Sequence, residues 1–235
     1  MGLVIVGVDV GQKVDPTAIV VCELEHREVA PARWEFPRQA GLFAATDQRR
    51  IPAKTEAHHT ARHLGRLPLG TPYPAVADAV AGIVAGLVRR GVARPRLMVD
   101  ATGVGVPVVE LIAARLGAHA RDLVACTFTH GDRYSQDERR RTASVGKAYL
   151  VSKLQALLQT KCLHLPTNAE SEALARELQD YEIRVDADAN DKYGAFKVGT
   201  HDDMVTALGL AVLYQEPPSR TLVFFRDPTV PRGGY

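Results

Sequence analysis

The stretch VIVGVDVGQKVDPTAIVVCEL, residues 4–24, holds two apolar runs separated by a turn. Its first run is valine and isoleucine broken by one glycine, which is typical of a buried strand that ends at Asp9. The segment GQKVDP that follows has turn chemistry, because the residue before a proline disfavours helix. A second strand is expected over residues 17–24, and two strands joined so closely should pair antiparallel. The first strand of the predicted sheet therefore ends at an acidic residue.

Strands and helices alternate along most of the remaining chain. Further strands are predicted at 58–67, 96–100 and 122–128, and helices at 75–90, 106–116, 144–160, 168–180 and 202–215. Within residues 28–56, ARWEF (32–36) is expected to be a short strand, and the stretch over 37–56 has no steady period and is expected to form a surface excursion. The segment between 128 and 144 is expected to be a polar loop. YEIRV (181–185) and GAFKV (194–198) are expected to pair as a β-hairpin.

This order predicts an α/β protein built on a mixed sheet. An antiparallel three-strand meander is followed by βα units, with helices on both faces and an added β-hairpin. It is the strand order of the ribonuclease H-like fold. We expect one domain over residues 1–215 and a Pro-rich C-terminal tail over residues 216–235.

Composition excludes several classes of protein. The chain has 235 residues, is 46% hydrophobic and 24% charged, and can bury a core, so wholesale disorder is not expected. A net charge of +2 means that any nucleic-acid footprint must be local. The three cysteines are widely spaced and are expected to be reduced core thiols. Since no apolar run approaches the roughly 20 residues of a membrane span, we expect a soluble intracellular protein with no membrane partner.

Acids mark the ends of three predicted elements. Asp9 and Asp100 end strands, and Asp202 and Asp203 begin the last helix. Sites in α/β sheets form where strands end at their carboxyl edge, so these carboxylates are expected to converge. Like charges held close repel unless a cation neutralises them, and Mg²⁺ or Mn²⁺ prefers oxygen ligands. Two such ions can activate water and stabilise the leaving oxygen in phosphodiester cleavage.

Each acid taken alone has a simpler interpretation. Asp202 fits a helix N-cap, and Asp203 fits a partner of the helix dipole. Asp9 and Asp100 each fit an ordinary turn acid. His201 is expected to cap the helix or to support a ligand rather than to bind metal itself. Their common position at element ends favours the metal site.

Three motifs carry a resemblance to a known family. GVDVGQKVDPTAIVV (7–21), LMVDATGVGVPVVELI (97–112) and VGTHDDMVTALGLAV (198–212) resemble, in order and spacing, the nuclease domain of viral terminase large subunits. The resemblance covers residues from about 3 to 214. It implies metal-dependent DNA cleavage, with two Mg²⁺ or Mn²⁺ ions bound by Asp9, Asp100, Asp202 and Asp203.

The resemblance also implies a setting for this chain. It implies double-stranded DNA as substrate, and an ATPase domain, a small terminase subunit and a portal as partners, in the cytoplasm of a bacterium that carries the phage. Full terminase subunits have a phosphate loop of the form GxxxxGK[ST], which this sequence lacks. We therefore expect an excised nuclease domain or the product of a shortened gene, without ATPase activity.

Other functions compete with this interpretation. A Holliday-junction resolvase on the same fold would need the same acids and would differ in cutting branched DNA. GVDVGQ and VDATGVG also resemble the phosphate loops of actin-like ATPases, which need two such domains. A DNA-docking or capsid-docking module whose acids are inactive would show no dependence on metal.

Basic residues are candidates for contact with DNA. Lys147, on the first turn of its predicted helix, fits a contact to the scissile phosphate or to an acid. Arg133 and the run from Arg139 through Arg140 to Arg141 fit tracking of the DNA backbone. Lys192, in the predicted loop around residues 190–193, fits steering of the duplex. A solvated surface position is an equally good interpretation of Lys147 and of the arginines.

Overall fold

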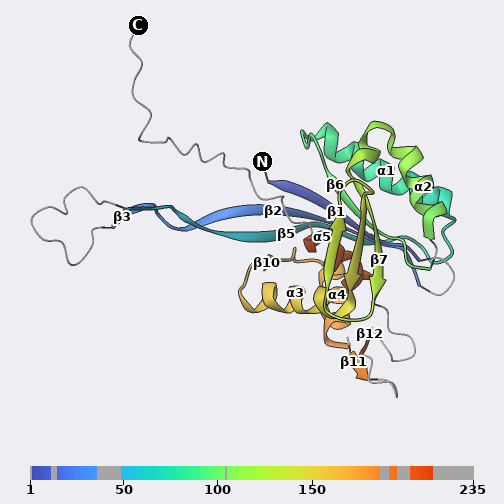
Figure 1. Cartoon of the computed structure of the whole chain (residues 1–235). Coiled ribbons are helices and arrows are strands. Elements are labelled where there is room, and N and C mark those ends of the chain that lie inside the picture. Colours follow the sequence, from blue (N-terminus) through green and yellow to red (C-terminus); the bar gives the residue numbers. More distant parts are fainter. Residues whose placement is uncertain are drawn as a thin grey trace, which may run out of the picture.

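An eight-stranded mixed sheet forms the centre of the molecule in a computed structural model (Figure 1). The structure describes residues 2–11, 15–35, 49–103, 105–180, 182–185, 191–194 and 202–213. The strands lie in the order β10-β5-β2-β1-β6-β7-β9-β8. Their bounds are β1 Leu3–Asp9, β2 Ala18–Ala30, β5 Lys54–Arg66, β6 Arg96–Asp100, β7 Leu123–Thr129, β8 Tyr134–Asp137, β9 Thr142–Gly146 and β10 Leu163–His164.

Strand β1 is the junction between the two halves of the sheet. On one side it pairs antiparallel with β2, with Val8 opposite Ile19, and β2 pairs antiparallel with β5. On the other side it pairs parallel with β6, which is followed by parallel β7 and β9. The predicted meander followed by βα units is confirmed.

Helices cover both faces of this sheet (Figure 1). Helices α1 (Tyr73–Arg89) and α2 (Gly105–Leu116) pack on one face, and a 3₁₀ helix over Gly117–Asp122 follows α2. The other face is covered by α3 (Lys147–Gln159), α4 (Ala169–Asp180) and α5 (Asp203–Leu213). Alternate side chains of β1 enter the two cores: Val6 packs toward α1 and α2, and Ile5 packs toward α5. A strand buried on both faces explains the continuous apolar run at the N-terminus.

Strands β2 and β5 continue beyond the sheet as a long ribbon (Figure 1). They stay paired as far as Ala30 opposite Lys54, and β3 (Arg33–Glu35) and β4 (Arg49–Ile51) form a separate two-stranded sheet. The short strand predicted at ARWEF is confirmed by β3, whereas the irregular excursion predicted over 37–56 was wrong for its described part, residues 49–56. Residues 26–30 are exposed, so no core selects apolar side chains on one face and the period-2 signal is lost.

The structure also differs from the sequence-based prediction between β7 and α3. The predicted polar loop contains β8, which pairs antiparallel with β9, and the helix begins at Lys147 rather than at 144. The sequence YSQD of β8 is polar and only partly covered, as befits the edge of a sheet. Short strands of this kind carry little hydrophobic pattern.

The added hairpin is confirmed with a different second strand. Strand β11 (Glu182–Val185) pairs antiparallel with β12 (Asp191–Gly194). The last three residues of DADANDKY, which were expected to lie in the turn, therefore belong to the second strand. Residues 195–198 and the predicted tail from 216 lie outside the described residues. Among the helices that the structure describes, none has the length and apolar character needed to cross a membrane.

Gly7 allows α5 to lie directly against β1. A Cβ at this position would overlap the carbonyl oxygen of Ala207 and lie 2.7 Å from the amide nitrogen of Ala211. Both are backbone atoms of α5, which cannot move aside as a flexible side chain can. Because α5 also begins at Asp203, this contact sets where the acidic motif stands relative to β1.

Replacing Gly7 with alanine is expected to destabilise the protein by displacing α5. Overpacking of this kind typically costs about 1–3 kcal/mol, measured as the change in the free energy of unfolding in urea. Gly82→Ala is the matched control, because a Cβ on this helical glycine would meet nothing within 4 Å. That change should be neutral or stabilise by up to about 1 kcal/mol. Equal stability of the two variants would contradict the close contact between β1 and α5.

Candidate active site

The ends of β1 and β6 place two carboxyl groups side by side. Val8 is in register with Val99 in a parallel pair, so Asp9 and Asp100 follow at the same edge of the sheet. A hydrogen bond between the two side chains is one of the effects that raise the pKa of Asp9. Helix α5 begins at Asp203 and packs on β1, which brings Asp202 and Asp203 close enough to act on the charge of Asp9. The four predicted acids therefore converge.

Burial and mutual repulsion dominate the electrostatics of this cluster. Burial raises the pKa of Asp9 well above its ordinary value, and the charges of Asp100, Asp202 and Asp203 raise it further. The pKa of Asp100 is also raised by burial, against the opposing effects of hydrogen bonds from Thr102 and the positive charge of Lys147. A cluster with such raised pKa values is a candidate functional site.

Thr102 holds Asp100 in place. Its backbone amide donates to Asp100 Oδ1 at 2.7 Å, and its hydroxyl oxygen accepts a hydrogen bond from the amide of Phe128 at 2.7 Å. The turn after β6 is thereby linked to β7. Thr102 was not predicted from the sequence, although an aspartate at a turn commonly accepts a hydrogen bond from the backbone amide two residues further on.

Arg66 is the partner of Asp203 and was also missed. Its Nε donates to Asp203 Oδ2 at 2.7 Å and its Nη2 to Oδ1 at 3.3 Å. The same guanidinium pairs with Glu177 on α4. Asp203 is 1% exposed, so a buried acid is compensated by one cation. Arg66 is the last residue of β5, more than a hundred positions from Asp203, and sequence spacing cannot reveal such a pair.

Lys147 stands at the carboxyl edge of the sheet. It begins α3 directly after β9, and its Nζ lies 5.8 Å from the centre of the Phe128 ring. Its charge lowers the pKa of Asp100, so it is near enough to act on the cluster. The structure thus places Lys147 with the acids.

The four arginines that were predicted to contact DNA lie at two separate places on the sheet, and all four are exposed. The carbonyl oxygen of Arg133 accepts a hydrogen bond from the amide of Gly146, so Arg133 lies at the same edge as Lys147. Arg139, Arg140 and Arg141 form the turn between β8 and β9, at the opposite edge of the sheet. Strand β9 has five residues, so the two positions are roughly 17 Å apart along the strand.

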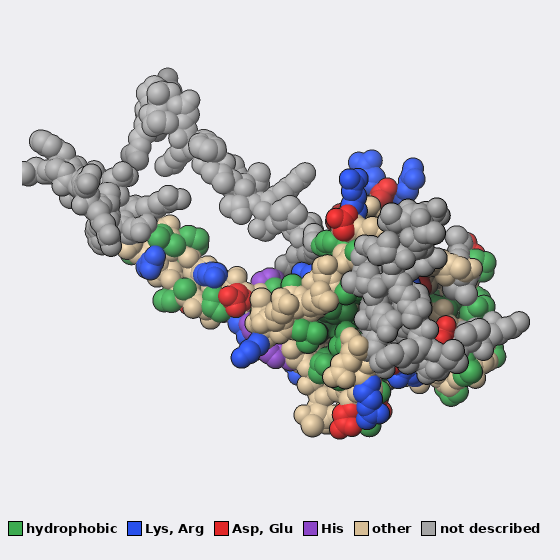
Figure 2. All heavy atoms as spheres, turned by 90° about the horizontal axis from the view of Figure 1, so that it is seen from below, with side chains coloured by type: hydrophobic (Ala, Val, Ile, Leu, Met, Phe, Trp, Pro, Cys, Tyr) green, Lys and Arg blue, Asp and Glu red, His purple; other side chains and the backbone are tan. Residues whose placement is uncertain are grey.

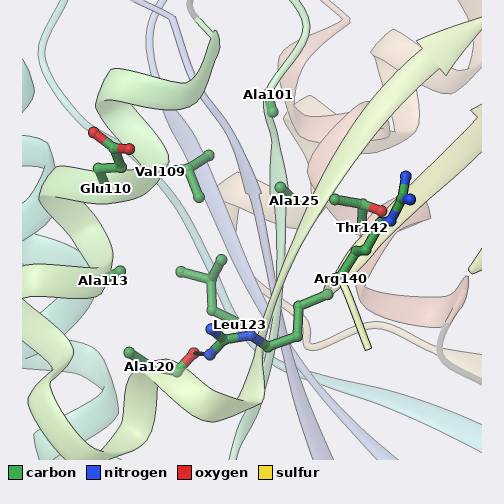
Figure 3. Close-up of a pocket in the computed structure, with 10 residues that line it drawn as sticks. Ala101, Val109, Glu110, Ala113, Ala120, Leu123, Ala125, Arg140 and Thr142 are labelled. Atoms are coloured by element: carbon green, nitrogen blue, oxygen red, sulfur yellow. Dashed lines mark hydrogen bonds between the residues drawn. The ribbon is translucent and has the colours of Figure 1, made fainter. Parts of the chain in front are cut away.

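A groove of about 280 Å³ runs beside β7 and α2 (Figure 3). Ala101, next to Asp100 in the chain, lines one part, and Arg140, Arg141 and Thr142 line another. Arg140 is also paired with Asp137, and Arg141 donates to the carbonyl oxygen of Ala120 at 3.1 Å. The remaining lining residues are mostly apolar.

The side chains of two predicted site residues lie outside the part of the chain that the structure describes. Lys192 lies on β12, but its side chain is not among those described. His201 lies outside the described residues, between the hairpin and Asp202. Their predicted roles stay predictions.

The residues present fit a hard divalent cation. The converging donors are carboxylate oxygens, and at least two of these acids have pKa values raised by burial and by neighbouring groups. Such an arrangement is stabilised when a cation neutralises the carboxylates. Asp203, already paired with Arg66, has lone pairs left beyond those that the guanidinium uses.

Comparison with known proteins places this domain in the ribonuclease H-like class of α/β folds. No protein-family model matches the chain, and no curated protein matches it. The large terminase nuclease of thermophilic phage G20c with bound magnesium is similar over 89% of this chain and 80% of that one, with 18% identity and a TM-score of 0.52. The cobalt-bound form of that nuclease gives the same four values, 89%, 80%, 18% and 0.52.

A herpesvirus protein shares the same architecture. The human cytomegalovirus terminase nuclease domain is similar over 88% of this chain and 81% of that one, at 10% identity and a TM-score of 0.50. The fold of this chain is therefore that of the terminase nuclease domains. At the level of fold, the resemblance inferred from the three sequence motifs is confirmed.

Replacing Arg66 with methionine should strongly destabilise the metal-free protein, because Asp203 and Glu177 would be left buried without their cation. Breaking a buried ion pair in this way costs about 3–5 kcal/mol. The free energy of unfolding in urea, with chelator present, measures the loss. Arg62→Met is the control on the same strand, because Arg62 is 53% exposed and pairs at the surface with Glu23. It should cost less than about 1 kcal/mol. If the two variants are equally stable, the Arg66 pair does not compensate Asp203.

Proposed function

We propose that this chain is the endonuclease domain of a phage DNA-packaging terminase. In this proposal it cuts concatemeric double-stranded DNA by metal-dependent phosphodiester hydrolysis with two ions. The observation that carries the proposal is the convergence of Asp9, Asp100, Asp202 and Asp203 at one edge of the sheet, with raised pKa values at Asp9 and Asp100. The magnesium and cobalt bound by the similar phage nuclease support a divalent cofactor.

The acids would act by holding Mg²⁺ or Mn²⁺. When bound, two such ions activate a water molecule and stabilise the leaving oxygen. Metal would bind the ionised forms of Asp9 and Asp100, whose pKa values are raised, so metal affinity should rise with pH. Thr102 fixes the Asp100 carboxylate, and Arg66 fixes that of Asp203. The carboxylate oxygens would then be held in place before metal and substrate arrive.

Lys147 is proposed to act on the substrate at the same edge. An ammonium group beside the acids can contact the scissile phosphate and offset its charge. Its present effect is on Asp100, whose pKa it lowers. The same charge therefore favours the ionised form of Asp100 that binds metal.

Contacts to DNA are proposed to be made to phosphates. Arg133 is at the edge that holds the acids, so it could contact the backbone close to the cut. Arg139, Arg140 and Arg141 are at the other edge and would contact a more distant part of the duplex. Lys192 and His201 keep their proposed roles in steering DNA and in supporting the acids. An ATPase domain, a small terminase subunit and a portal are the proposed partners, in the bacterial cytoplasm.

Incubation of the purified chain with plasmid tests this proposal. We expect cleavage in Mn²⁺ or Mg²⁺, no cleavage in EDTA, and no requirement for ATP, because the sequence has no phosphate loop with its lysine. Asp100→Asn should lower the rate by at least about a hundredfold through loss of a metal ligand. Asp78→Asn is the control, because Asp78 is an exposed acid on α1 whose partner is Arg115.

Two outcomes would count against the proposal. Folded protein that does not cut with either metal would leave a docking module as the better interpretation. Preferential cutting of a four-way junction over linear duplex would favour a junction resolvase on the same fold.

A further inference from the structure

A second cluster of metal-binding side chains lies where the β2–β5 ribbon meets the body of the molecule. Strand β10 pairs there with β5 through only two residues, and the amide of His59 donates to the carbonyl oxygen of Cys162 at 2.7 Å. One ligand atom each of Glu56, His58 and Cys162 lies within 4.8 Å of the others. Histidine side chains gather at this base of the ribbon (Figure 2).

His164 is directly engaged with this cluster. Its Nε2 lies 2.9 Å from His58 Nδ1, and the two rings stack with their centres 5.2 Å apart. At this distance one ring nitrogen donates a proton and the other accepts it. A metal-binding histidine usually donates its other ring N–H to an acceptor that fixes the orientation of the ring, and His164 Nε2 is placed to accept from His58 Nδ1.

The mixture of donors indicates the metal. Thiolate, imidazole and carboxylate together suit Zn²⁺, whereas Mg²⁺ avoids sulfur. Zinc binds these donors at about 2.0–2.3 Å, which puts them roughly 3.5 Å from one another. The three side chains would have to close by about 1 Å. Glu56 and His58 are half-buried and can move, and Glu56 has only a 3.8 Å contact with the exposed Lys54 to give up.

We propose that Glu56, His58 and Cys162 form a zinc site, with His164 holding the ring of His58 in position. The site would join the base of the ribbon to β10, which follows α3 in the chain. Such a bond would anchor the ribbon to the body of the molecule at a place where the backbone pairing is short.

This site is distinct from the acidic cluster. His58 lies eight residues before Arg66 on β5, so the two are about 26 Å apart along the strand. The donors also differ, because Asp9, Asp100, Asp202 and Asp203 offer carboxylate oxygens only. The thiols of Cys22 and Cys126 lie elsewhere in the core, and burial raises the pKa of both, that of Cys22 to about 12. Neither is expected to supply a thiolate.

Titration of the metal-free full chain with Co²⁺ tests the proposal through the absorption of thiolate-bound cobalt. We expect a thiolate-to-cobalt charge-transfer band that added Zn²⁺ removes. Cys162→Ser should abolish the band. His58→Asn should weaken binding at least about tenfold, and His164→Asn about tenfold through loss of orientation. His63→Asn is the control, because His63 is an exposed histidine of the same strand.

Two results would overturn the proposal: no charge-transfer band in the folded wild-type protein, or an undiminished band in Cys162→Ser. The outcome is separable from the nuclease proposal. An Asp9→Asn, Asp100→Asn double variant should keep the cobalt band while losing cleavage. Loss of the band in that double variant would place the thiolate signal at the wrong site and would also contradict the proposal.

Discussion

Repulsion among carboxylates is the constraint on which the site depends. At an effective dielectric constant of about 20, two unit charges about 5 Å apart repel by roughly 3 kcal/mol. The parallel pairing of β1 with β6 nevertheless sets Asp9 beside Asp100, and the close packing of α5 on Gly7 adds the acids of the last helix. The raised pKa values of Asp9 and Asp100 favour their neutral forms, which lessens the repulsion in the metal-free protein. Packing of the two cores holds the acids together against it.

The two cations near the cluster act on different acids. Arg66 compensates Asp203 in the interior and ties it to α4 through Glu177. Lys147 acts on Asp100 from the edge of the sheet. Within the part of the chain that the structure describes, the effects that act on Asp9 are burial and its acidic neighbours, and all of them raise its pKa. In our account Asp9 is therefore the residue that gains most from a bound metal.

The fold and the acidic positions were predictable because their signals are local. The apolar run that ends at Asp9, the strand that ends at Asp100 and the buried helix after Asp202 each show in a short window. Arg66 and Thr102 were missed for different reasons. Arg66 pairs with Asp203, which lies 137 positions further along the chain. Thr102 was considered only as part of the glycine-rich turn after Asp100. Strand β8 and the outer ribbon were missed because strands without a core face carry no hydrophobic period.

Melting of the wild type and of Asp9→Asn across pH, in chelator and in Mn²⁺, tests the central claim most directly. In the folded protein the pKa of Asp9 lies above the ordinary 3.8. At a pH between these two pKa values, the folded protein holds a proton that the unfolded chain has lost, so its stability falls as the pH rises. As pH rises above about 4 in chelator, the wild type should lose more stability than the variant. Mn²⁺ should restore the wild type more than the variant. Equal pH profiles and equal Mn²⁺ shifts in both proteins would contradict a repulsive carboxylate cluster built to hold metal.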